Sequence, residues 1–238
     1  MDADEGGRSP GERKVMGRFP QPSGTRGSLK WIQRAVNGRW PSLDEPILAS
    51  ISGAKSIAWV SPREHDDFAE YRDIAFLEKL GVSELAAGLQ TFWPSRGPQW
   101  DALGRTDNGA LLLVEAKAHI AEMCSSGTGA GEVSRARITA RLEEVATALG
   151  ARPNRAAWTE FFYQLANRIA HLHFLRRNGA PAWLVLVNFL NDREMGGPTT
   201  SEAWRAAYDV AFHVMGLGKR HALTPYIIEV FPVVAAAP

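Results

Sequence analysis

Hydrophobic and polar positions divide the chain into one aperiodic segment and a longer periodic region. Residues 1–27 are rich in Gly, Pro, Arg and Ser and lack an apolar cluster, which predicts a flexible N-terminal arm. Residues 28–238 carry helical and strand periodicities and are predicted to form a single domain, with an N-terminal helical extension. Ser28 is a candidate N-cap for the first of these helices.

Two kinds of spacing predict the elements of this domain. Apolar residues three and four positions apart predict helices, whereas alternation or a short apolar run predicts strands. The predicted helices cover residues 29–37, 45–51, 63–80, 135–149, 155–177 and 201–215. The predicted strands cover residues 56–60, 89–93, 99–105, 110–119, 182–190 and 226–231. From residue 63 on, the order helix, three strands, helix, strand predicts the α/β fold class.

One predicted hairpin brings charged residues together. The sequence TDNG at residues 106–109 is a strong turn signal between two strands. A three-residue loop pairs Thr106 with Ala110, and this register places Asp101 opposite Glu115. Two carboxylates in facing positions lie roughly 4.5–8 Å apart and repel each other unless a proton or a cation lies between them.

The second strand of the hairpin adds a lysine to the two acids. Glu115 and Lys117 share one side of the strand because side chains alternate. Mg²⁺, held by Asp101, Glu115 and the carbonyl of Ala116, would relieve the repulsion. Lys117 would then orient or deprotonate a metal-bound water, or neutralise charge that develops on a phosphate. The alternative is a surface ion pair at the frayed end of a strand.

In this setting the pattern Asp101, Glu115-Ala116-Lys117 resembles the PD-(D/E)xK nuclease superfamily, and the likeness covers residues 66–192. Trp100 stands where the motif often has proline. The resemblance implies a restriction-endonuclease-like core (αβββαβ, a mixed central sheet flanked by helices), in an uncharacterised bacterial branch. It also implies a nuclease that hydrolyses phosphodiester bonds of nucleic acid, with DNA as the expected partner. Asp101, Glu115 and Lys117 would be catalytic, and Mg²⁺, with Mn²⁺ as a substitute, would be the cofactor.

The resemblance further implies supporting residues on two helices. Glu70 is the candidate acid on the first helix, although the many acids around it equally suit a solvated face. On the long helix, Gln164 would contact the water or the scissile phosphate. Arg168 lies four positions on and has the bidentate geometry of a phosphate clamp, with an exposed helix face as the alternative. His119, just after the lysine strand, is a second candidate for nucleic-acid binding.

Composition restricts the function classes only weakly. The net charge of +1 requires any nucleic-acid partner to meet a local basic face. One cysteine, Cys124, and the lack of a long apolar run predict a cytoplasmic protein without a membrane partner. A homodimer is possible, as in many restriction-type nucleases. Two other functions stay open: a non-catalytic module that binds nucleic acid or protein and keeps the nuclease fold, and an enzyme acting on a small phosphate ester.

Overall fold

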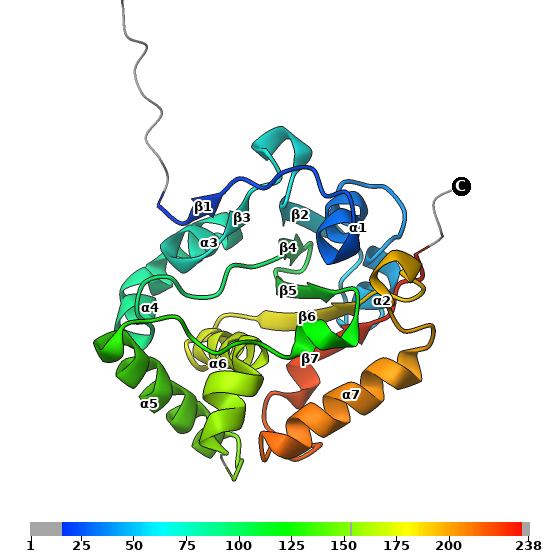
Figure 1. Ribbon diagram of the computed structural model, residues 1–238. Helices are drawn as coiled ribbons and strands as arrows, with labels where there is room; N and C mark the ends of the chain where they lie inside the picture. Colours follow the sequence, from blue (N-terminus) through cyan, green and yellow to red (C-terminus); the bar gives the residue numbers. More distant parts are fainter. Residues whose placement is uncertain (1–15, 153, 235–238) are drawn as a thin grey trace, which may run out of the picture.

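The computed structural model describes residues 16–152 and 154–234, and its centre is a five-stranded mixed sheet (Figure 1). The strand order is β2-β4-β5-β6-β7. Strands β2, β4 and β5 pair antiparallel, whereas β5, β6 and β7 pair parallel. The strands are β2 (Ile57–Ser61), β4 (Ala102–Thr106), β5 (Leu111–Lys117), β6 (Ala182–Asn188) and β7 (Ile227–Val230). A separate two-stranded sheet pairs β1 (Arg18–Phe19) with β3 (Glu70–Tyr71).

Helices cover both faces of the five-stranded sheet. They are α1 (Gly27–Val36), α2 (Asp44–Leu48), α3 (Asp73–Leu80), α4 (Ala86–Phe92), α5 (Glu132–Ala148), α6 (Tyr163–Arg177) and α7 (Ser201–Val214). Figure 1 shows α1 and α2 beside one face and α3, α4, α5 and α6 toward the other. The predicted α/β class with a mixed sheet flanked by helices is therefore confirmed.

Strand β5 lies at the centre of the sheet, and all seven of its residues are buried. Its side chains alternate between two hydrophobic clusters. Leu111 and Leu113 pack in the larger cluster with α3, α5 and α6, whereas Leu112 and Val114 pack in a second cluster with α1 and α2. By the same alternation, Glu115 and Lys117 point toward the side of α3 and α6.

The predicted hairpin and its register are confirmed. Thr106 and Ala110 close the turn, with the Thr106 N–H donating to the Ala110 carbonyl at 2.9 Å. Ala102 then pairs with Val114, so the next pair outward in this register is Asp101 and Glu115. Gly109 has a φ of 90°, which a glycine adopts without the strain that a side chain would cause.

The predicted helix over residues 63–80 is wrong in its first half. Asp67 and Phe68 have left-handed φ values of 52° and 49°, and the α-helix begins only at Asp73. Between them, β3 pairs with β1, so its backbone groups bond to another strand instead of to a helical turn. Glu70 is consequently a strand residue.

Strand β1 belongs to the segment that the sequence assigned to the flexible arm. Residues 1–15 of that arm lie outside the described residues. Residues 16–27 are part of the folded structure, through β1 and through the Gln21 N–H, which donates to the Asp67 carbonyl at 3.0 Å. The first helix begins at Gly27, and Ser28 is not its N-cap.

Two further elements differ from their prediction. Residues 89–92 are the last four residues of helix α4, not a strand, and Leu89 is the residue that this helix buries. Trp93 follows the helix in extended backbone. The long helix predicted over residues 155–177 is a π-helical segment, Ala157–Phe161, followed by α6, with a break at Phe162. The other predicted helices and strands are confirmed within a few residues of their ends.

None of the helices within residues 16–152 and 154–234 has both the length and the apolar character needed to cross a bilayer.

Replacing Gly197 by Ala is expected to destabilise the fold, because Gly197 lies against the backbone at the end of β5. A Cβ atom at this glycine would overlap the carbonyl oxygen of Ala118, the residue that follows β5. Because backbone must move to relieve the overlap, we expect urea unfolding to show a loss of about 1–3 kcal/mol. Gly129→Ala is the control, since its Cβ would meet no atom within 4 Å. Equal stabilities of the two variants would contradict the expectation.

Candidate functional site

Glu115 and Lys117 form a buried ion pair at the end of β5. Their exposed fractions are only 4% and 5%. The Lys117 Nζ lies 2.9 Å from the Glu115 Oε1. The alternative from the sequence, a surface pair at a frayed strand end, is therefore wrong. Charged side chains are almost never buried without a partner, and here each of the two residues is the partner of the other.

Lys117 is held by three oxygens. Besides Glu115, its Nζ donates to the carbonyl of Glu122 at 2.9 Å and to the Oε1 of Gln164 at 3.2 Å. An ammonium has three N–H donors, so each one has an acceptor here. Gln164 comes from the first turn of α6, and its own backbone N–H donates to the Ser125 hydroxyl at 3.2 Å. The glycine- and serine-rich loop after β5 thus helps to position Gln164.

Asp101 lies beside this pair, just before β4. Its Oδ2 accepts the backbone N–H of Ala116 at 2.7 Å. Burial raises the pKa of Asp101 well above its usual range, and the negative charges of Glu115 and Glu70 raise it further. The nearby Arg168 guanidinium opposes this shift. Burial is the larger cause, so the raised pKa reflects first the lost hydration of this carboxyl and second its two acidic neighbours.

Glu70 reaches the same cluster from β3. It is buried, and its Oε2 accepts the side-chain amides of Gln99 at 2.5 Å and Gln21 at 3.2 Å. Burial raises the pKa of Glu70 to about 7, partly offset by the Gln99 hydrogen bond and the Arg168 charge. The solvated acidic face proposed as the alternative is wrong for this residue, although Glu78 in α3 is exposed.

Arg168 of α6 completes the network. Only 4% of its side chain is exposed, so the alternative of an exposed helix face is wrong. Its Nε donates to the Glu115 Oε2 at 2.6 Å, and an Nη donates to the Gln99 carbonyl at 2.7 Å. The guanidinium also lies over the Trp100 ring, 4.8 Å from its centroid. Arg168 is therefore turned inward onto a carboxylate, and its guanidinium is already hydrogen-bonded to Glu115, Asn167 and Gln99.

Charge pairing decides the ionisation of Glu115. Burial by itself would raise the pKa of this carboxyl, but Arg168 and Lys117 outweigh burial and hold the pKa below its usual range. Glu115 is thus the ionised acid of the cluster. Glu70, with a pKa of about 7, is the acid that takes up a proton near neutral pH, and Asp101, whose pKa is also raised, holds a proton more readily than a free aspartate.

The donor set has the chemistry of a magnesium site with few protein ligands. Asp101 and Glu115 offer hard oxygen ligands on facing strand positions, and each Glu115 oxygen keeps a second lone pair beside its hydrogen bond. Within residues 16–152 and 154–234, no group of three or more His, Cys, Asp or Glu side chains is placed to hold a metal. Mg²⁺ is commonly bound by one or two carboxylates, with water and substrate phosphate as the other ligands, so the residues fit the ion.

Two other predicted site residues lie at the edge of the cluster. Ala116 contributes its N–H to Asp101, and it is the residue between the two members of the ion pair. His119 is partly exposed and pairs with Glu122, with 3.1 Å between its Nε2 and the Glu122 Oε1. The structure therefore joins Glu70, Glu115, Lys117, Gln164 and Arg168 in one hydrogen-bonded cluster, with Gln99 between Glu70 and Arg168. Asp101 joins it through the backbone N–H of Ala116, and His119 contacts the side chain of Glu122, whose carbonyl accepts from Lys117.

Sequence reasoning missed the glutamines that hold the acids. The side-chain amide of Gln99 donates to Glu70, and its backbone carbonyl accepts from Arg168. Gln99 therefore links Glu70 to Arg168. Its position two residues before Asp101 was the only local signal. Gln21 had no signal at all, because it lies 49 positions from Glu70.

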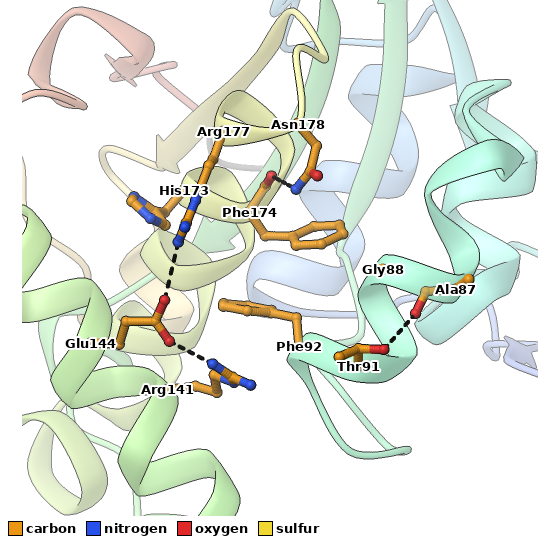
Figure 2. Close-up of a pocket in the computed structure, with 10 residues that line it drawn as sticks. All are labelled: Ala87, Gly88, Thr91, Phe92, Arg141, Glu144, His173, Phe174, Arg177 and Asn178. Atoms are coloured by element: carbon orange, nitrogen blue, oxygen red, sulfur yellow. Dashed lines mark hydrogen bonds and ion pairs between the residues drawn. The ribbon is translucent and has the colours of Figure 1, made fainter.

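A pocket of about 530 Å³ lies away from this cluster, between α4, α5 and α6. Figure 2 shows its lining, with Glu144 between Arg141 and Arg177. The Phe92 and Phe174 rings stack there with centroids 5.1 Å apart. None of the site residues predicted from the sequence lines it. Because Glu144 already pairs with both arginines, we assign no chemistry to this pocket.

Glu70→Gln is expected to change how stability depends on pH. A carboxyl whose pKa rises on folding from 4.5 to about 7 stays protonated in the folded protein while the unfolded chain ionises. The wild type should therefore lose stability relative to the variant as pH rises from about 4.5 to about 7, by up to about 3 kcal/mol. Urea unfolding at several pH values measures this difference. The exposed Glu78→Gln is the control, and a difference that stays constant with pH would refute the assignment.

Removing Arg168 is expected to leave Glu115 short of one partner. Arg168→Met should cost about 3–5 kcal/mol of unfolding free energy, because a buried carboxylate loses half of its neutralising charge. Adding Glu115→Gln should recover a large part of that loss, since the uncompensated charge is then gone. Urea unfolding of both single variants and the double variant gives the coupling energy. Strictly additive losses would show that the two side chains do not act as a pair.

Comparisons with family models, with curated proteins and with solved structures give no significant match to this chain.

Proposed function

We propose that this protein is a divalent-metal-dependent nuclease of the PD-(D/E)xK type, with DNA as its expected substrate. The observation that carries the proposal is the convergence of Asp101, Glu115 and Lys117 at the end of a buried hairpin. Placing a half-buried acid beside a buried acid and a buried lysine is costly for a fold. Such clusters with strongly shifted pKa values are found preferentially at functional sites.

The arrangement of elements supports a restriction-endonuclease-like core. Helix α3 precedes β4 and β5, which carry the motif residues at their adjoining ends, and α5, α6 and β6 follow in the expected order. One departure is that the first of the three expected strands is a helix, α4. Strand β2, which precedes α3 in the chain, instead provides the third antiparallel strand of the sheet.

Each residue of the cluster has a role in phosphodiester hydrolysis. A bound Mg²⁺ or Mn²⁺ would supply Lewis-acid stabilisation and lower the pKa of a coordinated water. Asp101 and Glu115 would hold the ion. With all three N–H groups directed at oxygens, Lys117 suits stabilisation of negative charge on the phosphate better than proton abstraction.

The proton of the attacking water has a plausible acceptor in Glu70. A pKa of about 7 is close to the optimum for a general base at neutral pH. Gln164 lies beside Lys117, and from there it would orient that water or the phosphate. Arg168 would fix the orientation of Glu115 from within the core, so we assign it a positioning role instead of the phosphate contact that was one of the two interpretations of the sequence.

One observation favours a second candidate function. Glu115 is already neutralised by Arg168 and Lys117, which is how a module that keeps the nuclease fold without turnover would stabilise a remaining acid. Such a module would bind nucleic acid or protein. Added Mg²⁺ or Mn²⁺ would then leave its melting temperature unchanged, whereas a nuclease site that binds the ion gains stability by mass action.

The decisive experiment is a cleavage assay on single- and double-stranded DNA and RNA with Mg²⁺ or Mn²⁺. We expect cleavage by the wild type, with a fall of about 100-fold or more for Asp101→Asn and for Lys117→Ala. Asp209→Asn is the control, because Asp209 is exposed in α7 and, among the described residues, forms an ion pair with Lys219 alone.

Two outcomes would count against the nuclease. Metal-stimulated cleavage that persists in full in Asp101→Asn would assign the activity to another site or a contaminant. Intact substrates, together with a melting temperature that does not respond to metal, would favour the binding module. Cleavage confined to small phosphate esters would show that the substrate is a small phosphate ester and not a nucleic acid.

A further inference from the structure

A second pocket, of about 730 Å³, lies where β1, the start of α3 and the end of α4 meet. These elements lie together on one side of the molecule in Figure 1. Its lining is rich in arginine and aromatic side chains: Arg18, Phe19, Arg72, Trp93, Arg96 and Arg137. None of the residues assigned above to metal binding or catalysis lines it.

The positive charge of this pocket is poorly neutralised. Among the described residues of its lining, Asp73 is the one carboxylate, and the Asp73 oxygens accept the backbone N–H groups of Arg96 at 3.1 Å and Gly97 at 2.8 Å. Arg96 and Arg137 have no ion pair with any described residue. Arg18 differs, because it pairs with Asp66 and Asp67 outside the lining.

Two buried donors of the lining lack an acceptor. The Arg72 Nε has no hydrogen-bond partner within the described structure, and its closest carboxylate oxygen, in Asp73, is 3.7 Å away. The Trp93 Nε1 also has no partner there, although only 3% of that side chain is exposed. Both atoms are enclosed by protein, so a ligand with several acceptor oxygens would bond instead to the accessible guanidinium groups of the lining, such as that of the exposed Arg96.

The shape and chemistry of the lining suit a phosphate attached to a planar group. Guanidinium groups bind phosphate oxygens in a bidentate way. The Phe19 ring, 4.0 Å from the Arg72 guanidinium, and Trp93 provide aromatic surface of the kind on which bases stack. The volume lies within the range of about 300–1,000 Å³ that holds a small organic ligand, which includes a nucleotide.

The pocket adjoins the acidic cluster through two chain segments. Glu70 and Arg72 are two residues apart in extended backbone, so their Cα atoms are at most about 7 Å apart and their side chains share one side. On the facing segment, Gly97 bonds to Asp73 of the pocket, and Gln99 bonds to Glu70 of the cluster. A nucleotide in the pocket would therefore lie close to a phosphodiester at Lys117.

We propose that the arginine pocket binds a phosphate of the nucleic-acid strand next to the one that is cleaved. That the ligand is a strand rests on the proposed nuclease function, whereas binding of a phosphate ester does not. The pocket would thus hold the substrate by its backbone, independently of base sequence, and fix the distance between the held phosphate and the reacting one.

The test is metal-free binding measured by calorimetry in the Lys117→Ala background. The probes are a short oligothymidylate with a 5′-phosphate, the same strand without it, thymidine monophosphate and inorganic phosphate. Arg72→Gln and Arg96→Gln should each weaken oligothymidylate binding about tenfold, and the affinity should fall with added salt. Arg205→Gln on α7, outside the pocket lining, is the control and should bind like the parent.

The outcomes separate this proposal from the nuclease assignment. Unchanged affinity in both Arg72→Gln and the more exposed Arg96→Gln would overturn the pocket, even if Asp101-dependent cleavage is found. Loss of affinity in these variants without any cleavage by the wild type would support the pocket and reject the nuclease. Tight binding of the monophosphate, with no gain from the longer strand, would overturn the strand as ligand. A preference for the 5′-phosphorylated strand would assign the pocket to a chain end.

Discussion

The surrounding structure depends on the pairing of one buried, ionised carboxylate, that of Glu115 at the end of the central strand. A charge in that position is tolerated only if it is paired and hydrogen-bonded on both oxygens. Arg168 and Lys117 do this at 2.6 and 2.9 Å. The requirement fixes the register of α6 against β5, because Arg168 must face the strand, and it places Gln164, one turn earlier, beside Lys117.

The cluster as a whole holds more acid than base. Glu70, Asp101 and Glu115 share two permanent cationic partners, Arg168 and Lys117, so full ionisation would leave one excess negative charge. The fold accommodates this by raising the pKa of Asp101 and of Glu70, that is, by holding a proton. A divalent cation would replace that proton and make the net charge of the cluster positive until a phosphate enters. In the proposed function, a proton, a metal ion and a substrate would in turn compensate the charge of this cluster, as expected of a metal-dependent hydrolase.

Local sequence signals predicted the hairpin but not the environment of its charges. An Asn-Gly turn and strict alternation fix the pairing of Asp101 with Glu115 within sixteen residues of chain. The burial of Arg168 depends on packing of α6 against β5, more than fifty positions away, and its sequence spacing suited an exposed face equally well. Glu70 was placed on a helix because the pairing of β3 with β1, which breaks that helix, involves a segment without apolar periodicity. Residues 89–93 were assigned to a strand because so short an apolar window does not distinguish a strand from a helix, and residues 89–92 in fact end α4.

The pairing of β1 with β3, which makes the helix prediction wrong, also positions residues of the acidic cluster and of the arginine pocket. By holding residues 70–72 extended, it directs Glu70 toward the acidic cluster and Arg72 toward the arginine pocket from one side of the backbone. A helix through these residues would have separated their directions by about 200°, since each helical residue advances about 100°. Gln21, from the segment that follows β1, closes over Glu70, and Phe19 of β1 covers Arg72. The N-terminal segment is therefore a structural part of the site, and the acids and arginines are placed next to each other by the short sheet that it forms.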